Sequence, residues 1–407
     1  METPVTDPKG APGEGRAGRD IRFGGRCVKA SERPDPQRIL VRGVNWLGDA
    51  VMTTPALLRL RERFPETHIT LLTQQKLRDL WDSHPAVDEI LTFEKGESLW
   101  TVAKRIRQGR FDWALLLPNS PRTGLEAFIA RVPRRIGGSW RWRNRLLTDI
   151  VSVRDTAGQM KKRTPAQVRA LVALADAGGD APRATYDVAH HQTHHYLRLV
   201  AHLGANPTPL RPLLSLSAGE QSKASALYIG AGKPSRWIGL NAGAEYGPAK
   251  RWPLENFAAA ANELYRREGC GFVVFGGPAD VELANRLTGL LSVPAGHKIS
   301  LAGKTSLREL MISLAGCQVL LTNDTGPMHV AAALGVPVVV PFGSTSPELT
   351  GPGLPGDPTH HWVRVSTPCA PCFLRECPVD FRCMKGIVPE RVTEAVVAAL
   401  RARERGL

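Results

Sequence analysis

The sequence predicts an α/β protein made of two doubly wound halves that face each other across a cleft. From Arg38 to Gly137, short β-branched runs alternate with helical patterns, and the same alternation runs again from Ile238 to Pro341. The proline-rich stretch 206–212 separates the halves and is typical of an interdomain linker. Because alternating strands and helices form parallel sheets covered by helices, each half is expected to be a Rossmann-like domain.

The expected strands are short β-branched or apolar runs, and the expected helices show apolar side chains at helical spacing. In the first half we expect strands at 39–41, 68–73, 89–93, 113–117 and 134–137, and helices at 47–63, around Leu77, at 99–107 and at 124–131. In the second half we expect strands at 238–241, 271–275, near Ile299, 319–322 and 336–341, and helices at 254–267, 279–290, 307–314 and 327–334. A last helix, 389–405, could pack on either half. Ligands of such sheets bind beyond the carboxyl ends of the strands, so function should concentrate in the loops after strands.

Length and composition indicate an ordinary globular protein. The chain has 407 residues, of which 43% are hydrophobic and 22% charged, enough for about two or three domains. The longest apolar run, 330–342, is shorter than the ~20 residues of a membrane span. The first 36 residues lack a secretory signal, so a cytoplasmic protein is expected, with either a real tail or a start nearer Arg38. We divide the chain into a disordered leader at 1–36, an N-terminal domain at 37–205, a C-terminal domain at 206–388 and a terminal helix at 389–407.

Positive charge is concentrated in one window of the first half. The net charge is +15, and residues 131–170 hold 11 Lys or Arg against two acids, a local excess of 11 − 2 = +9. Such a cluster suits phosphate-bearing partners or an anionic membrane surface, and the alternative is a solvated basic loop. No RNA- or DNA-binding motif accompanies it, so nucleic acid is not an expected partner.

Three loops after predicted strands carry reactive groups. The first, Asn45-Trp-Leu-Gly-Asp49, has the glycine spacing of a P-loop, but Asp49 stands where the lysine would be, which disfavours nucleoside-triphosphate hydrolysis. Asp49 is either an ordinary helix-start residue or a general base that faces the cleft.

The other two loops lie in the second half. Gly243-Ala-Glu-Tyr-Gly-Pro-Ala-Lys-Arg-Trp-Pro253 joins a glycine-rich turn to two cations, which suits a pyrophosphate, although an ordinary strand-to-helix loop is the alternative. Thr322-Asn-Asp-Thr-Gly-Pro-Met-His329 brings an acid, a hydroxyl and an imidazole to a helix start, where Pro327 suits the first turn. His329 alone could equally be a buried, satisfied histidine.

In order and spacing, these three loops, together with Thr53-Thr-Pro-Ala56, resemble the ADP-heptose:lipopolysaccharide heptosyltransferases, glycosyltransferase family nine. The resemblance covers some nine-tenths of the chain, from about Ile39 to the last helix. It implies a GT-B fold and inverting, metal-independent transfer of L-glycero-D-manno-heptose, with no cofactor required. It further implies ADP-heptose as donor, bound by the C-terminal domain, and the heptosylated, Kdo-lipid A based inner core as acceptor, bound by the N-terminal domain.

The resemblance also implies residue roles. Asp49 is the expected catalytic base, and Lys250 the expected cation that stabilises the leaving diphosphate. The expected donor contacts are Gly243, Glu245, Arg251, Asp324, Thr325, Gly326 and His329. The expected acceptor contacts are Asn45, Arg141, Arg143, Lys161 and Lys162. Because the acceptor is built at the inner membrane, peripheral contact with its cytoplasmic face is expected through the basic window.

Two clusters stay outside this scheme. Cys369, Cys372, Cys377 and Cys383 lie within 15 residues, which suggests a structural zinc ion or iron–sulfur cluster, or else reduced thiols that pack a loop. In the run His190-His-Gln-Thr-His-His195, His191 and His195 have a metal-chelating spacing, but a solvated or interdomain helix explains them better.

Alternatives for the function remain open. Within the same family, the chain could add the first heptose of the core rather than the second, or transfer another sugar. A protein of a different class would bind a nucleotide sugar or a polyanion without catalysis. The presence of both Asp49 and Lys250 argues against such a binding-only role.

Overall fold

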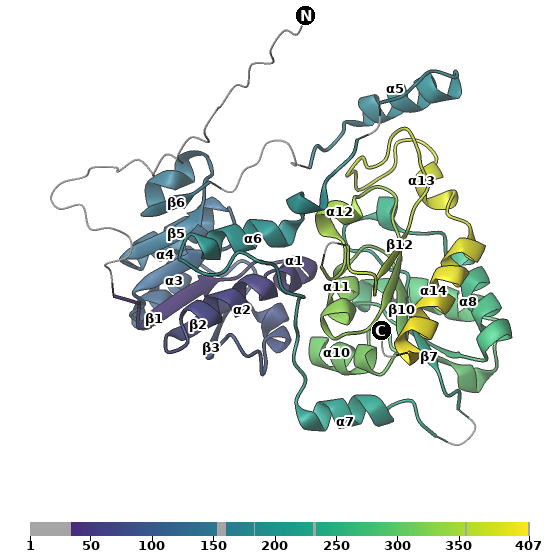
Figure 1. Ribbon diagram of the computed structural model, residues 1–407, viewed down its shortest axis with the longest axis horizontal. Helices are drawn as coiled ribbons and strands as arrows, with labels where there is room; N and C mark the ends of the chain where they lie inside the picture. The colour runs from purple at the N-terminus through teal and green to yellow at the C-terminus, as the bar shows by residue number, and fades with distance from the viewer. Residues whose placement is uncertain (1–33, 153–159, 183, 231–232, 355, 406–407) are drawn as a thin grey trace, which may run out of the picture. The chain divides into compact units, whose positions relative to one another are not determined.

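The computed structural model describes residues 34–152, 160–182, 184–230, 233–354 and 356–405. The predicted leader, except for its last residues, lies outside the described residues. From Pro36 onward the chain forms one compact unit that contains two six-stranded sheets (Figure 1). Within the described ranges, no helix has the length and apolar character needed to span a membrane.

The first sheet is parallel throughout, with the strand order β3-β2-β1-β4-β5-β6 of a doubly wound fold. Its register places Leu40 of the central strand between Thr70 and Ala114. The strands are β1 (Arg38–Arg42), β2 (His68–Gln74), β3 (Glu89–Phe93), β4 (Trp113–Leu116), β5 (Arg134–Gly138) and β6 (Asp149–Val151). Five of these were expected, and β6, a three-residue strand at the sheet edge, was missed.

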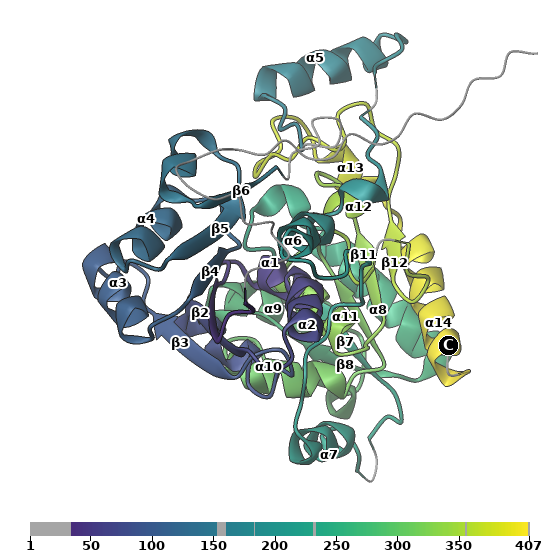
Figure 2. The same cartoon turned by 60° about the vertical axis from the view of Figure 1, so that its left-hand side comes forward.

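Helices cover both faces of the first sheet. They are α1 (Leu47–Met52), α2 (Thr54–Arg63), α3 (Leu99–Gln108) and α4 (Pro121–Ile129), with the 3₁₀ turns η2 (Gln75–Leu80) and η3 (Arg141–Leu146). The single helix expected at 47–63 is broken at Thr53, because Pro55 lacks an amide hydrogen and opens a new helix. Helices α3 and α4 pack side by side on one face of the sheet (Figure 2).

The second sheet is also parallel, in the order β12-β11-β10-β7-β8-β9. Its strands are β7 (Trp237–Asn241), β8 (Gly271–Val274), β9 (Lys298–Ser300), β10 (Val319–Thr322), β11 (Val338–Pro341) and β12 (His361–Val363). Its helices are α7 (Ala218–Ala226), α8 (Leu254–Glu268), α9 (Val281–Leu290), α10 (Leu307–Ala315), α11 (Gly326–Ala333), α12 (Pro347–Thr350), α13 (Arg382–Lys385) and α14 (Pro389–Glu404), with the 3₁₀ turns η6 (Pro248–Lys250), η7 (Pro278–Asp280) and η8 (Ala295–His297). The last helix, α14, packs on α8 and β11, which assigns it to this sheet.

The segment between the halves contains α5 (Pro165–Asp176), η5 (Val188–His190) and α6 (Gln192–Ala201). Helix α6 packs on α2, so it belongs to the first sheet. One buried apolar cluster runs through both halves, from Leu57 and Leu199 to Met311 and Val330. The chain therefore has two parallel sheets, as expected from the sequence, and a buried apolar cluster that joins the two halves.

Candidate active site

A pocket of about 1130 Å³ lies where the carboxyl ends of both sheets meet. The first half contributes the loops after β1, β4 and β5 and the start of α6, and the second half contributes the loops after β7 and β10. This position follows from the parallel strands, because all their carboxyl ends lie at one edge. Of the predicted site residues, the pocket wall includes Asn45, Asp49, Arg141, Glu245, Lys250, Asp324, Thr325, Gly326 and His329.

Asp49 lies in the first turn of α1 and lines the pocket. Burial raises the pKa of its carboxyl group to about 6, and the positive charge of Lys250 acts in the opposite direction. A carboxylate with this pKa is ionised at neutral pH and is still basic enough to accept a proton. Asp49 is therefore a carboxylate of raised pKa that lines the pocket.

Lys250 stands on the opposite wall, at the end of the 3₁₀ turn η6. Its ammonium Nζ lies 2.6 Å from Oδ2 of Asp324, and the same oxygen accepts a 2.6 Å hydrogen bond from the hydroxyl of Thr345. The Nζ atom also lies 5.0 Å from the centre of the Tyr246 ring. Asp324 thus holds the largely buried ammonium group of Lys250 at the pocket surface, where this group can bind an anionic ligand.

The loop after β10 is tied to the loop after β7 by Asn323. Its buried side chain donates to the carbonyl of Ala242 (2.7 Å) and accepts from the amide of Trp252 (3.0 Å). These bonds fix the start of α11, where the extended Thr325 precedes the helix and Pro327 occupies its first turn. Pro327 carries no N–H, and the amide of Met328 donates to the carbonyl of Thr325 at 3.1 Å, so the start of α11 adds partial positive charge beside Lys250 mainly through the helix dipole.

The two halves touch at the starts of α1 and α11. A Cβ added to Gly48 would lie 2.7 Å from Cδ2 of the His329 ring, and one added to Gly326 would lie 2.8 Å from Cδ2 of Leu47. Both positions therefore require glycine for this approach. Burial lowers the pKa of His329 to about 4, so its imidazole is neutral at the pocket wall.

Five predicted site residues lie outside the pocket wall. Arg143 is fully buried, and its guanidinium donates to the carbonyls of Gly138 (2.8 Å) and Pro118 (2.9 Å). The expectation that Arg143 binds an acceptor is therefore wrong, because its donors hold the loops after β4 and β5 together. The other four residues outside the wall are Gly243, Arg251, Lys161 and Lys162.

Gly243 and Arg251 face Asp280 instead. A Cβ on Gly243 would lie 2.6 Å from the Asp280 carboxylate, and Nη2 of Arg251 lies 4.0 Å from Oδ1 of the same residue. Lys161 and Lys162 are exposed and follow Met160, which lines the pocket.

In the described part of the chain, nothing supports a metal centre at the four clustered cysteines. Among the described residues, no group of three or more His, Cys, Asp or Glu side chains is placed to hold a metal ion. Cys369 and Cys372 pack instead with Val168 and Val172 of α5 in a small apolar cluster. Burial raises the pKa of Cys383 to about 12, as expected of an inert thiol. The expectation of zinc or an iron–sulfur cluster is thus not supported, and the alternative of packed reduced thiols fits.

Sequence reasoning missed the histidine wall, which consists of His190, His191, His194 and His195 and lines the pocket beside α1. His191 caps α6, accepting from the amide of Thr193, and its Nε2 lies 3.1 Å from the carbonyl oxygen of Gly351 in the other half. Burial lowers the pKa of His195 to about 4. The four imidazoles were separated in sequence from every strand-end loop, so only the fold of α6 onto α2 could place them here.

Comparisons with known proteins agree with this architecture. The family model described as glycosyltransferase family 9 (heptosyltransferase) matches residues 99–381. The chain is 35% identical over 324 residues to lipopolysaccharide heptosyltransferase 2 of Salmonella typhimurium and 34% identical over 324 residues to that of Escherichia coli, with 77% of this chain and 85% of each relative covered. It superposes on the structure of E. coli ADP-heptose lps heptosyltransferase II with a TM-score of 0.69 and 28% identity, over 90% of this chain and 99% of that one.

Proposed function

Because the chain belongs to glycosyltransferase family 9 and has the GT-B fold, we propose that it transfers heptose from ADP-heptose to the already heptosylated inner core of lipopolysaccharide. The observation that carries this proposal is that Asp49, from the first half, and Lys250, from the second half, line the same pocket. Asp49 supplies a base to the acceptor side, and Lys250 supplies positive charge to the donor side.

The donor lies against the second half. Lys250, Asp324 and the start of α11 at Thr325 and Gly326 form its polar surface, with the neutral His329 and Glu245 beside them. The leaving group is a diphosphate, which suits an ammonium group and the positive end of a helix dipole. These residues stabilise the charge that develops as the bond to the sugar breaks.

The acceptor enters from the first half. Asn45 and Arg141 line this side, and the exposed Lys161 and Lys162 approach the anionic groups of the acceptor beyond the pocket wall. Asp49 takes the proton from the acceptor hydroxyl, whose oxygen attacks the anomeric carbon while ADP departs from the other face. Because the base and the diphosphate stand on opposite faces of the sugar, the anomeric configuration inverts.

No metal ion takes part in this proposal. The positive charge that a diphosphate needs comes from Lys250 and the helix start, and the sequence contains no Asp-x-Asp pair of the kind that chelates a metal–diphosphate complex. The reaction takes place at the cytoplasmic face of the inner membrane, which holds the lipid acceptor. The basic window of the first half favours peripheral contact with that surface.

Addition of the second heptose is favoured over addition of the first. The relatives matched over 77% of this chain are named heptosyltransferase 2, whereas the match to lipopolysaccharide heptosyltransferase 1 of Pseudomonas aeruginosa covers 31% of it. The test is incubation with ADP-heptose and either Kdo₂-lipid A or the same lipid bearing one heptose, with EDTA present, read by mass spectrometry. We expect a gain of one heptose on the second acceptor alone. A gain on the first acceptor alone overturns the order of addition, a gain only with added Mg²⁺ overturns metal independence, and no gain on either overturns the activity.

A further inference from the structure

Trp46 is a large aromatic side chain that lines the pocket and has no role in the mechanism above. It lies in the loop between β1 and α1, three residues before Asp49, and is 48% exposed. Large aromatic side chains are usually buried, and aromatic surface that stays open in a pocket commonly contacts the ligand. The open indole therefore indicates a ligand contact close to Asp49.

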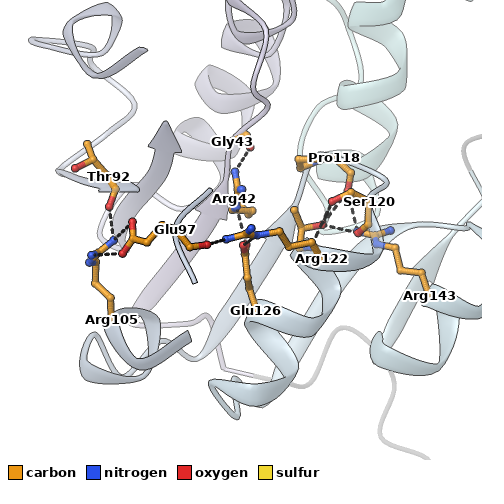
Figure 3. A network of polar contacts seen from close by, with 11 residues as sticks. Arg42, Gly43, Thr92, Glu97, Arg105, Pro118, Ser120, Arg122, Glu126 and Arg143 are labelled. Carbon is orange, nitrogen blue, oxygen red and sulfur yellow. Dashed lines mark hydrogen bonds and ion pairs between the residues drawn. The ribbon is translucent and has the colours of Figure 1, made fainter. Parts of the chain in front are cut away.

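The loop that carries Trp46 is held at both ends. At its start, the buried guanidinium of Arg42 donates to the carbonyl of Gly43 at 2.6 Å and to the carboxylate of Glu126 at 2.9 Å (Figure 3). At its end, the carbonyl of Trp46 accepts a 2.9 Å hydrogen bond from the amide of Ala50 in the first turn of α1. The exposure of Trp46 therefore belongs to a fixed segment of backbone rather than to a loose loop.

Trp46 and Asp49 occupy neighbouring positions at the start of α1. Trp46 has an extended backbone and directly precedes the helix, and Asp49 is the third residue of the helix. Side chains at these two positions lie on the same side of a helix start, which is why they can cap each other's backbone in other helices. Residues three apart on a helix have Cβ atoms about 5 to 6 Å apart, a distance that one sugar ring can span. A single sugar can therefore contact both side chains.

The Trp46 ring also has a cation on it. The ammonium nitrogen of Lys76 lies over the ring, 5.8 Å from its centre, and is attracted by the negative charge of the ring face. Lys76 is exposed and, among the described residues, lies outside the pocket wall that Trp46 lines. With Lys76 in this position, nearly half of Trp46 is still exposed. The contact therefore favours one orientation of the ring and leaves ring surface open to a ligand.

We propose that Trp46 stacks on the pyranose ring of the acceptor sugar whose hydroxyl meets Asp49. In the proposed function, on which this inference rests, that sugar is the heptose already attached to the core. A pyranose face carries mainly C–H groups, which pack on the face of an indole. Its hydroxyl groups stay at the ring edge, where Asn45 and Asp49 line the pocket. Stacking fixes the plane of the sugar and so holds the attacking hydroxyl at the carboxylate.

The test is steady-state kinetics with ADP-heptose and a deacylated, water-soluble form of the heptosylated acceptor. Trp46→Ala should raise the acceptor KM at least about tenfold and leave the KM for ADP-heptose within about twofold, because the variant removes only the aromatic face. Trp46→Phe should keep the acceptor KM within about threefold, because phenylalanine retains such a face. The matched control is Trp100→Ala, at a tryptophan 68% exposed at the start of α3 and outside the pocket wall, which should behave like the wild type.

Fluorescence reports the same contact without any transfer. Titration of the wild type with the acceptor alone should change the tryptophan emission, and most of this change should be missing in Trp46→Phe although that variant still binds. Within the described structure, the Trp46 side chain makes no capping hydrogen bond to α1, so both variants should fold, which urea unfolding checks.

An unchanged acceptor KM in Trp46→Ala overturns the proposal. So does a rise in the KM for ADP-heptose instead, because the indole would then contact the donor sugar. A Trp46→Phe variant that binds acceptor as weakly as Trp46→Ala also overturns it, because stacking would not be the cause. Failure of the proposed function looks different, since the wild type then transfers no heptose while the acceptor titration still tests the contact. A wild type that neither transfers heptose nor binds the acceptor overturns both.

Discussion

Replacement of Asp49 by asparagine tests two effects of this carboxylate: its effect on the free energy of unfolding and its role in catalysis. The raised pKa means that the folded state favours the protonated carboxyl, so the ionised carboxylate opposes folding at neutral pH. A shift from 3.8 to about 6 corresponds to at most about 3 kcal/mol at 1.36 kcal/mol per unit. Because Asp49 faces a pocket open to water, we expect asparagine to raise the free energy of unfolding by about 1 to 3 kcal/mol at pH 7.5.

The stability gained by Asp49→Asn should decrease as the pH falls. The cost of ionising Asp49 in the folded state is absent below about pH 4, where the residue is protonated in both states, and is complete above about pH 6. Urea unfolding at several pH values should therefore show the variant and the wild type converge as the pH falls. The control Asp79→Asn, at a surface carboxylate whose side chain is 39% exposed, should change stability by less than about 0.5 kcal/mol.

Although Asp49→Asn should stabilise the fold, it should slow the transfer reaction. Loss of a general base typically costs about 10² to 10⁴ in rate, so Asp49→Asn should bind ADP normally and transfer heptose that much more slowly. In the wild type, kcat/KM should fall about tenfold per unit below pH 6, as the base becomes protonated. An asparagine variant that keeps wild-type turnover, or keeps the same acid limb, would refute the assignment of Asp49 as the base.

Three further substitutions probe the rest of the site. Lys250→Met should lower kcat by about 10² to 10³ and weaken ADP binding, because the substitution removes the cation from the diphosphate side. Steady-state kinetics measures the first effect and calorimetry the second, and a normal kcat would exclude Lys250 from the mechanism. Gly48→Ala should lower kcat by about 10², because the added methyl group meets the ring of His329 and separates the two halves; an unchanged kcat would show that this contact is dispensable. Glu126→Gln should destabilise the fold by about 3 to 5 kcal/mol in urea unfolding, because it removes the negative charge 2.9 Å from the buried guanidinium of Arg42. A destabilisation below about 1 kcal/mol would contradict this prediction.

The strand-end loops were predictable because their signal is local. A short apolar run followed by glycine and polar residues marks the end of a parallel strand, and parallel strands end at one edge. This reasoning predicts that the loops carrying Asp49, Lys250 and Asp324 meet at one cleft, and all three residues line the pocket. It did not place the three-residue edge strands β6 and β12, although it placed the equally short edge strand β9 near Ile299.

Other features depend on contacts that no local pattern encodes. Nothing in the sequence distinguishes Arg143 from the neighbouring arginines. In the fold, the contacts of its guanidinium with the carbonyls of Gly138 and Pro118 explain why Arg143 is buried. The histidine wall reaches the pocket only because α6 returns to pack on α2. Long-range packing decides both cases, which is why the sequence alone assigned Arg143 to acceptor binding and did not place the histidines at the pocket.

The most direct test of the two-sided mechanism is the anomeric configuration of the transferred heptose, measured by NMR on the product. A base on the first half and a diphosphate held by the second half act on opposite faces of one sugar. The mechanism predicts a single product whose anomeric configuration is opposite to that of the donor. A product that retains the donor configuration would contradict it, since retention requires a second displacement that this pair of residues does not provide.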